Sequence, residues 1–471
     1  MNVCDELPEA PSVAAVHESA LRVLERTGVV VQDDEAVALL VSRGFRCSGR
    51  RVFLTEDQVQ RALATAPSSF VLAGRRPELG LPLGGADGRV FGSGSGAAYM
   101  LERDAAGVPV MRPGTLADLE ATAKLGHMLP AIDFNSDSME PLDLPEEART
   151  RQGTRVRLLA SDKAIEWVAS VDEDLDDAER INEILFGAGW HQRPRALIVL
   201  NTTAPLQLSG ETSRLTLRWA RLGQPICATS CVMGGTTGPA SLAGVLAVQH
   251  AEVLAALVLG QAAREGAPFV YGGLPVMASL RTGAARFSGP EFVRMAVATA
   301  QLAHHCGLPV RAGAACTDSH TVDAGAMAES AEALSAAVLA GAHFLFQAAG
   351  IMSSFNALSL AKYVLDADVI AALRAAVDPL RVGEECLAED VIEAVGPGGS
   401  YLGQAHTRRH ARDFEHAGSM APEPFERWVA AGAEDAADVA ARRVRELLEA
   451  HKSPGDLDAV TLRQLDTYCG I

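Results

Sequence analysis

From about residue 116 the sequence alternates helical segments with short apolar runs, and this alternation restricts the fold more than any other feature. The runs are short and continuously apolar, as expected of parallel strands that are covered on both faces. The predicted helices span residues 116–125, 146–159, 176–185, 211–222, 241–263, 290–304, 323–339 and 358–375. The predicted strands span residues 164–170, 196–201, 225–230, 268–273, 308–314 and 343–349.

Six or more such alternations without a dinucleotide-binding fingerprint favour a closed barrel over a doubly wound sheet. We therefore predict an α/β protein, a (βα)8 TIM barrel with an N-terminal α-rich cap and a C-terminal helical extension. The cap, which also contains short strands, covers residues 1–100, and the barrel core covers 101–383. A loop and a helical extension follow in residues 384–471, with an amphipathic helix around 435–451.

Composition and charge exclude several classes of protein. Of 471 residues, 48% are hydrophobic and 21% are charged, which is typical of a well-packed protein and not of a disordered chain. The formal net charge of −18 argues against nucleic-acid binding, since phosphates need a basic surface. The acidic N-terminus shows no secretory signal, and the eight scattered cysteines indicate reduced thiols, so we expect a cytoplasmic protein.

One segment, residues 242–261, is apolar enough for a membrane span. Its Gln249, His250 and Glu252 would be costly in lipid, so we expect a buried barrel helix and no membrane contact. Cys227 and Cys231 are four residues apart, but no second pair with zinc spacing accompanies them, so the pattern does not indicate a zinc site.

Active groups of a barrel enzyme lie at the carboxyl ends of its strands. No recognisable Ser-His-Asp order and no His-Glu-x-x-His motif occurs in the sequence. The polar or aromatic positions at the predicted strand ends are Trp167, Ser170, Asn201, Thr202, Thr203, Thr229, Ser230, Tyr271 to Pro275, Thr317 to His320, and Gln347.

Several of these positions also have a structural interpretation. Glu252 could face solvent or pair with an arginine, and Asp323, near Asp318 and His320, is equally suited to cap the next helix. His406 and His410 could share a metal ion, but no carboxylate accompanies them, which favours a surface or interface role. The Gly-Ser-Gly-Ser-Gly run at 92–96 lacks the Lys of a phosphate-binding loop and is better interpreted as a turn at a sheet rim.

Several ordered segments together carry a family resemblance. They read GTLADLEATAKLGHML, GTTGPASLAGVLAVQHAEVLAALVLGQ, APFVYGG, LRTGAARFSGPE, GLPVRAGAACTDSHTVDAGAMAESAEAL and VGPGGSYLGQAHTRRH. With this set at compatible spacings, the chain resembles the trimethylamine methyltransferase family over nearly its whole length. The resemblance implies a barrel that hands a methyl group from an amine to the Co(I) of a corrinoid protein docked over its mouth.

The founding trimethylamine enzymes of that family carry pyrrolysine, whereas this chain has only standard residues. We place the corresponding region around residues 318–323. The chain therefore resembles the branch that acts on quaternary amines, with glycine betaine or a related betaine as the expected substrate. A quaternary nitrogen leaves as a neutral tertiary amine, so catalysis would consist mainly of orienting one methyl group and excluding water.

The resemblance also assigns roles to residues. We predict His320, Asp318 and Glu252 as catalytic groups. Aromatic faces or a carboxylate would bind the substrate cation, and amide, hydroxyl, histidine or arginine donors would bind its carboxylate. The predicted cation-binding residues are Trp167, Tyr271, Phe344, Phe346 and Glu252, and the predicted carboxylate-binding residues are Asn201, His320, Arg281 and Gln347.

A cobalamin-binding Asp-x-His-x-x-Gly motif is absent from the sequence, so the corrinoid is expected on a separate protein, with no tightly bound metal in this chain. The resemblance further implies a homo-oligomer. Two other functions stay open. The chain could be a barrel lyase or aldolase, for which Lys163 is the lysine near a predicted strand, or a non-catalytic member that binds a betaine.

Overall fold

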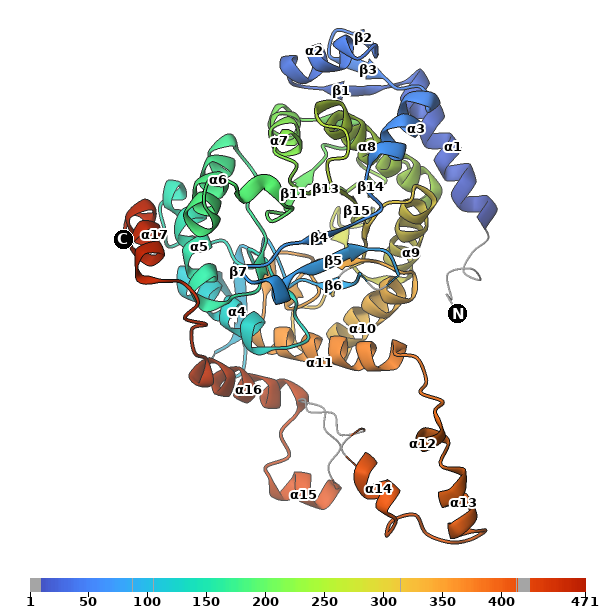
Figure 1. The fold of residues 1–471 in the computed structure, drawn as a ribbon, viewed down its shortest axis with the longest axis vertical. Coiled ribbons are helices and arrows are strands. Elements are labelled where there is room, and N and C mark those ends of the chain that lie inside the picture. The colour runs from blue at the N-terminus through green and yellow to red at the C-terminus, as the bar shows by residue number, and fades with distance from the viewer. Residues whose placement is uncertain (1–9, 87, 105, 314, 412, 414–423) are drawn as a thin grey trace.

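The computed structural model describes residues 10–86, 88–104, 106–313, 315–411, 413 and 424–471. At its centre lies a six-stranded parallel sheet in the order β11-β13-β15-β18-β19-β6 (Figure 1). These strands are β11 (Ile198–Asn201), β13 (Ile226–Ser230), β15 (Phe269–Gly273), β18 (Val310–Arg311), β19 (Phe344–Leu345) and β6 (Val90–Phe91). A second parallel pair consists of β9 (Phe134–Asn135) and β10 (Ala164–Ile165).

Each of these strands leads into a helix that packs on the outside of the sheet (Figure 1). The mixed α/β fold and its strand–helix alternation, predicted from the sequence, are thereby confirmed. The helices are α4 (Leu116–Met128), α5 (Glu146–Ala160), α6 (Asp172–Phe186), α7 (Gly210–Arg221), α8 (Leu242–Ala263), α9 (Gly289–His305), α10 (Ala324–Leu339) and α11 (Leu360–Val377).

Regular ladders do not close the strands into a barrel. The two ends of the six-stranded sheet meet the β9–β10 pair only through single bridges, Gly92 with Phe134 and Trp167 with Ile198. The strands also end earlier than predicted, since β10 stops at Ile165 and β18 at Arg311. Ala314, the predicted end of the β18 run, lies outside the described residues.

The helices begin where the sequence provides caps. Asp323 accepts a hydrogen bond from the backbone N–H of Ala326 at 2.9 Å, so its structural interpretation as an N-cap is correct. Helix α8 is long and apolar enough to cross a membrane, but 78% of its most apolar window is buried inside the protein. It packs against α1, α3 and α7, as predicted for a core helix.

The N-terminal segment forms a small layer beside α8 (Figure 1). It contains α1 (Ala10–Arg26), β1 (Val29–Val31), α2 (Asp34–Ser42), β2 (Arg46–Ser48), β3 (Arg51–Phe53) and α3 (Glu56–Thr65). Strand β1 pairs with β12 (Gln207–Leu208), which ties this layer to the loop after β11. The predicted boundary at residue 100 stays a prediction, although β6 pairs with β19 of the central sheet.

Shorter strands surround the main sheet. They are β4 (Ser69–Leu72) paired with β5 (Leu81–Gly84); β7 (Tyr99–Arg103) paired with β8 (Pro109–Pro113) and with β21 (Ala357–Leu358), which also pairs with β20 (Ile351–Met352); and β14 (Met233–Gly234), β16 (Val276–Ala278) and β17 (Ala285–Arg286). The described residues also contain two single turns of 3-10 helix, η2 (Pro77–Leu79) and η3 (Trp190–Gln192).

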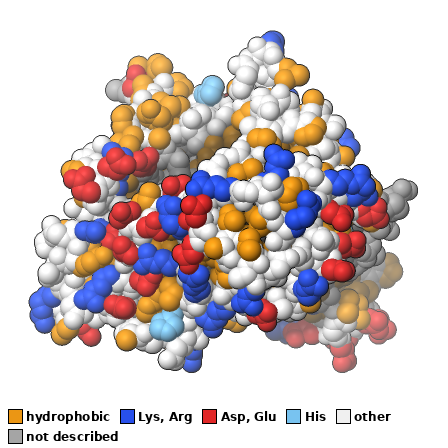
Figure 2. All heavy atoms as spheres, turned by 90° about the horizontal axis from the view of Figure 1, so that it is seen from above, with side chains coloured by type: hydrophobic (Ala, Val, Ile, Leu, Met, Phe, Trp, Pro, Cys, Tyr) orange, Lys and Arg blue, Asp and Glu red, His pale blue; other side chains and the backbone are white. Residues whose placement is uncertain are grey.

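After α11 the chain leaves the central body as an extended arm and then returns (Figure 1). The arm carries α12 (Glu384–Leu387), α13 (Glu389–Val395), α14 (Ala405–His410) and α15 (Phe425–Ala430). Helix α16 (Ala436–Ala450) then packs on α11 and α4, and α17 (Ala459–Cys469) packs on α5 and α6. Figure 2 shows acidic and basic side chains intermixed on one face of the molecule.

Candidate active site

A cavity of about 660 Å³ lies at the carboxyl ends of the central strands, where barrel enzymes bind their substrates. Residues from β11, β13 and β18, and from the loops that follow β6, β9, β10, β15 and β19, contribute to its wall. Its size suits a small organic molecule. The wall has three chemically distinct parts: a pair of carboxylates, a buried arginine and a group of phenylalanines.

Glu166 and Asp137 form the acidic part, and Glu211, a third carboxylate of the wall, is exposed. Ser95 Oγ and the backbone N–H of Asp137 both donate to Glu166 Oε2, at 2.9 and 3.0 Å. Burial, together with the neighbouring Asp137 carboxylate, raises the pKa of Glu166 to about 7, although these two hydrogen bonds lower it. Burial also raises the pKa of Asp137, against the effect of Arg157, whose Nε lies 3.7 Å from its carboxylate. This wall attracts a cation once both carboxyl groups are ionised.

Arg311 is the buried cation of the cavity, with only 1% of its surface exposed. Its guanidinium donates to the side-chain oxygen of Gln347 and to the carbonyl of Gly273, and lies 5.7 Å from the centre of the Phe346 ring. Burial lowers its pKa. Among the described residues no carboxylate lies within ion-pairing distance, and Nε has no hydrogen-bond partner. A buried arginine of this kind calls for an anion supplied from the cavity.

The aromatic part contains Phe287 and Phe355, whose ring centroids are 5.3 Å apart. Asp318 holds both rings in place from behind. Its carboxylate accepts hydrogen bonds from the backbone N–H of Phe287 and from the Oγ atoms of Ser288 and Ser354, at 3.1, 2.7 and 2.8 Å. Ser353, Ser354 and Phe355 have φ values of 55°, 53° and 78°, a left-handed run that non-glycine residues seldom adopt. Such strain is concentrated at functional sites.

The family model described as trimethylamine methyltransferase (MTTB) matches residues 3–470. The chain belongs to this family. It is 36% identical over 406 residues to the glycine betaine methyltransferase of Desulfitobacterium hafniense (strain Y51). The aligned region covers 85% of this chain and 84% of that protein. It is 28% identical over 462 residues to the trimethylamine methyltransferase MttB of Desulfitobacterium hafniense (strain DSM 10664 / DCB-2), covering 96% and 91% of the two chains.

A solved structure supports the fold of this trimethylamine methyltransferase family member. The crystal structure of the Methanosarcina barkeri monomethylamine methyltransferase (MtmB) matches with a TM-score of 0.54 and 10% identity, over 93% of this chain and 88% of that one. This likeness concerns the fold alone. The resemblance inferred from the sequence motifs is therefore confirmed at the level of the family.

In this family member the cavity brings together three of the residues predicted for the site. Asn201 lies at the end of β11, and Phe346 and Gln347 follow β19, so all three occupy the wall. Phe344 lies deeper inside, fully buried and stacked on Phe346 with centroids 5.1 Å apart. It supports the wall from below.

Glu252 lies outside the cavity wall, fully buried on α8. Its carboxylate accepts hydrogen bonds from Thr202 Oγ1, Ser230 Oγ and the backbone N–H of Leu206. Burial raises its pKa, and these donors lower it. The expected pairing with an arginine does not occur in the described residues. Instead Glu252 fixes the turn after β11 that presents Asn201.

The other predicted residues point elsewhere. Trp167 packs in the layer between strands and helices, and Tyr271 reaches the same layer, where its hydroxyl lies 2.8 Å from His250 Nδ1. His320 is exposed, lies 2.9 Å from Ser353 Oγ and lines a separate cavity of about 340 Å³ beside α16. Arg281 is exposed at a third cavity. None of these four side chains lies in the wall of the candidate active site, so their positions do not support the predicted roles.

Sequence reasoning missed Glu166, Asp137, Arg311, Phe287 and Phe355. Glu166 and Arg311 fall within the predicted strands 164–170 and 308–314, and a charged residue inside an otherwise apolar run was the available signal. In a sheet with both faces covered, such a residue must lie in a cavity or pair with another group.

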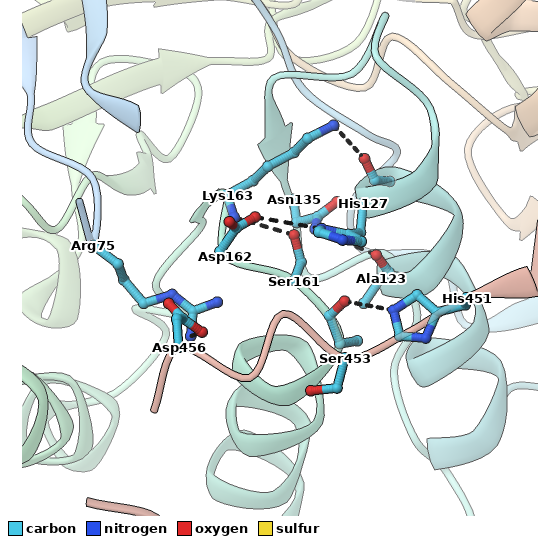
Figure 3. A network of polar contacts seen from close by, with 12 residues as sticks. Arg75, Ala123, His127, Asn135, Ser161, Asp162, Lys163, His451, Ser453 and Asp456 are labelled. Atoms are coloured by element: carbon cyan, nitrogen blue, oxygen red, sulfur yellow. Dashed lines mark hydrogen bonds and ion pairs between the residues drawn. The ribbon is translucent and has the colours of Figure 1, made fainter. Parts of the chain in front are cut away.

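Lys163, the lysine considered for a Schiff base, directly precedes β10 and so lies at the opposite end of this strand from the cavity. Figure 3 shows its surroundings. Its Nζ donates to the carbonyls of Gly126, Leu129 and Ile132 at 2.7, 3.0 and 2.6 Å, and burial lowers its pKa to about 8. Around it the C-terminal segment docks through Asp456, which pairs with Arg75 at 3.3 Å, and through His451 (Figure 3). This lysine joins segments of the fold and does not reach the cavity wall.

Proposed function

We propose that this protein is a methyltransferase that moves an N-methyl group from a betaine, glycine betaine or a close relative, to the Co(I) of a corrinoid carried by a separate protein. The observation that carries the substrate class is Arg311, a buried cation without a carboxylate partner in the described residues. A trimethylamine lacks an anion for it, whereas a betaine has one. The similarity to a protein named glycine betaine methyltransferase supports the same class.

The cavity offers complementary groups for both ends of a betaine. The carboxylate of the substrate binds the guanidinium of Arg311 and the amides of Gln347 and Asn201. The quaternary ammonium then lies toward Glu166 and Asp137 and the faces of Phe287 and Phe355. A substrate held at both ends presents one methyl group in a fixed direction. This orientation accounts for much of the rate acceleration that positioning of the substrate can provide.

The cavity has room for a small amine and not for a corrinoid macrocycle beside it. This agrees with a corrinoid that approaches the open end on its own protein and supplies the Co(I) nucleophile there. The residues of this chain bind and orient the substrate and exclude water from the methyl group. No proton transfer is needed at nitrogen, because a neutral tertiary amine departs.

Three further properties belong to this proposal. The single bridges between Gly92 and Phe134 and between Trp167 and Ile198 favour a closed eight-stranded barrel as the working form. The seven cysteines among the described residues are free, which agrees with a cytoplasmic location. Exposed apolar residues on the arm, among them Leu402 and Phe425, favour a homo-oligomer.

To test this, a panel of methylated amines is incubated with the protein and Co(I) cobalamin. The reaction is measured by the loss of the Co(I) absorption and by the amount of demethylated amine released. Glycine betaine is expected to react, and choline and trimethylamine are not, because neither carries a carboxylate for Arg311. Arg311→Met should lose the preference for glycine betaine over choline. Consumption of trimethylamine or choline at the rate of glycine betaine would contradict the proposal.

A further inference from the structure

Three potential metal ligands meet in the layer between the N-terminal helix and the central body, and none of them lines the candidate active site. His17 on α1, His250 on α8 and Cys306 at the end of α9 place their Nδ1 or Nε2 and Sγ atoms within 4.8 Å of one another. All three side chains are almost fully buried. Figure 1 shows α1 lying along α8 and α9, and both contacts are part of the packing.

The geometry of this group is close to that of a zinc site. His17 Nδ1 and His250 Nε2 are 2.8 Å apart. In a tetrahedral zinc site with Zn–N distances of about 2.0–2.1 Å, two ligand nitrogens are about 3.3 Å apart. A small outward shift of the two rings therefore makes room for an ion that Cys306 Sγ can also reach. Imidazole nitrogen and thiolate sulfur are the ligands that zinc prefers.

The surroundings of the group supply the outer contacts of a metal site. Tyr271 places its hydroxyl 2.8 Å from His250 Nδ1, so the second ring nitrogen of this histidine is held by a hydrogen bond, as is usual for metal-binding histidines. His305 is exposed and packs edge-on against His17 with ring centroids 4.7 Å apart, so a further imidazole ring lies beside the group.

We propose that His17, His250 and Cys306 form a structural site for Zn²⁺ that fastens the N-terminal helix α1 to α8 and α9. Without the ion, the two histidines and Tyr271 form a hydrogen-bonded chain, and Cys306 is a free cysteine. When the ion binds, Cys306 loses its proton to solvent, and the His250 proton lies on Nδ1, where it is donated to Tyr271. No electron is transferred. This site is independent of the proposed methyl transfer.

The test uses the full-length protein, stripped with a chelator and titrated with Co²⁺ as a spectroscopic probe and then with Zn²⁺. We expect one ion per chain, a thiolate-to-cobalt absorption band, tetrahedral cobalt bands in the visible range, and a higher Tm after Zn²⁺ is added. Cys306→Ser should lose the thiolate band, and His17→Gln should lose most of the metal affinity.

Two controls separate this site from other metal-binding residues. Cys386→Ser removes an exposed cysteine, and His410→Ala removes one of the paired histidines on the arm, whose rings are 4.4 Å apart. Both should bind cobalt as the unaltered protein does. A cobalt spectrum that persists in Cys306→Ser and disappears in His410→Ala, or a protein whose spectrum and Tm do not respond to either metal, would overturn the proposal. Should Cys306→Ser fail to fold, His17→Gln and the metal response of the unaltered chain still decide it.

Discussion

Glu166 is 8% exposed, and burial together with the nearby Asp137 raises its pKa to about 7. A quaternary ammonium carries its charge at every pH, so its attraction to this wall depends on the ionisation of the two carboxyl groups. We expect the affinity for glycine betaine to increase as the pH rises from 6 to 8. Glu166→Gln should remove most of this pH dependence and weaken binding at pH 8 about tenfold, the equivalent of about 1.4 kcal/mol. Calorimetric titration across this range measures both effects.

The raised pKa of Glu166 also predicts how the stability of the fold depends on pH. Because the pKa of Glu166 is raised in the folded protein, its contribution to stability is present below the ordinary pKa of a glutamate and is lost as the pH rises through about 7. Glu166→Gln should therefore raise the Tm more at pH 8 than at pH 5. Glu173→Gln, a change at an exposed glutamate of α6, serves as the control and should leave the Tm unchanged at both pH values. A Tm gain that is equal at both pH values would show that Glu166 is ionised at pH 5 as well.

At the scale of elements, the turn after β11 depends on one side chain from α8. Glu252 accepts hydrogen bonds from Thr202, Ser230 and Leu206, so its removal leaves three donors buried or half-buried. An unsatisfied buried donor costs about 1–3 kcal/mol. We expect Glu252→Ala to lower the free energy of unfolding in urea by about 3 kcal/mol or more, and Glu252→Gln, which keeps an acceptor, by about 1 kcal/mol.

The kinetic effect of Glu252→Gln distinguishes this structural role from the catalytic role predicted by sequence. A residue that only fixes the turn should leave kcat within a few-fold, whereas a catalytic carboxylate should lose turnover in a protein that remains folded. An inactive but stable Glu252→Gln protein would restore the sequence-based prediction.

The elements themselves were largely predictable. Helices such as α9 and α10 lie within one or two residues of their predicted bounds, because caps and the helical period are local properties. The strands were predicted too long, since an apolar run continues into buried loops where the ladder has already ended, as after Ile165. The prediction of which side chains point into the cavity was the least accurate. Tyr271 lies in the middle of β15 and Phe346 directly after β19, and only Phe346 reaches the cavity, because successive side chains of a strand point to opposite faces of the sheet.

At the scale of the whole molecule, the arm between α11 and α16 is the part that the central body does not cover (Figure 1). Leu402 is 84% exposed and Phe425 is 68% exposed, and several other large apolar residues of the arm, among them Leu380 and Ile392, are more than half exposed. Monomeric proteins seldom leave so many apolar side chains on one segment in contact with water. The arm lies beside the helices and not over the strand ends. A second copy of this chain is therefore a better partner for its apolar side chains than a corrinoid protein, which would dock at the open end of the cavity.

We therefore expect the protein to have a mass in solution of at least twice the 49.4 kDa of one chain, measured by light scattering after gel filtration. The double substitution Leu402→Glu with Phe425→Asp places charges among the apolar contacts and should reduce the mass to that of a single chain, because burying an unpaired charge costs more than the contact gains. Val41→Glu introduces a charge at an exposed apolar position on α2 and should leave the mass unchanged. A monomeric unaltered protein, or dissociation by Val41→Glu and not by the double substitution, would show that the arm does not hold the copies together.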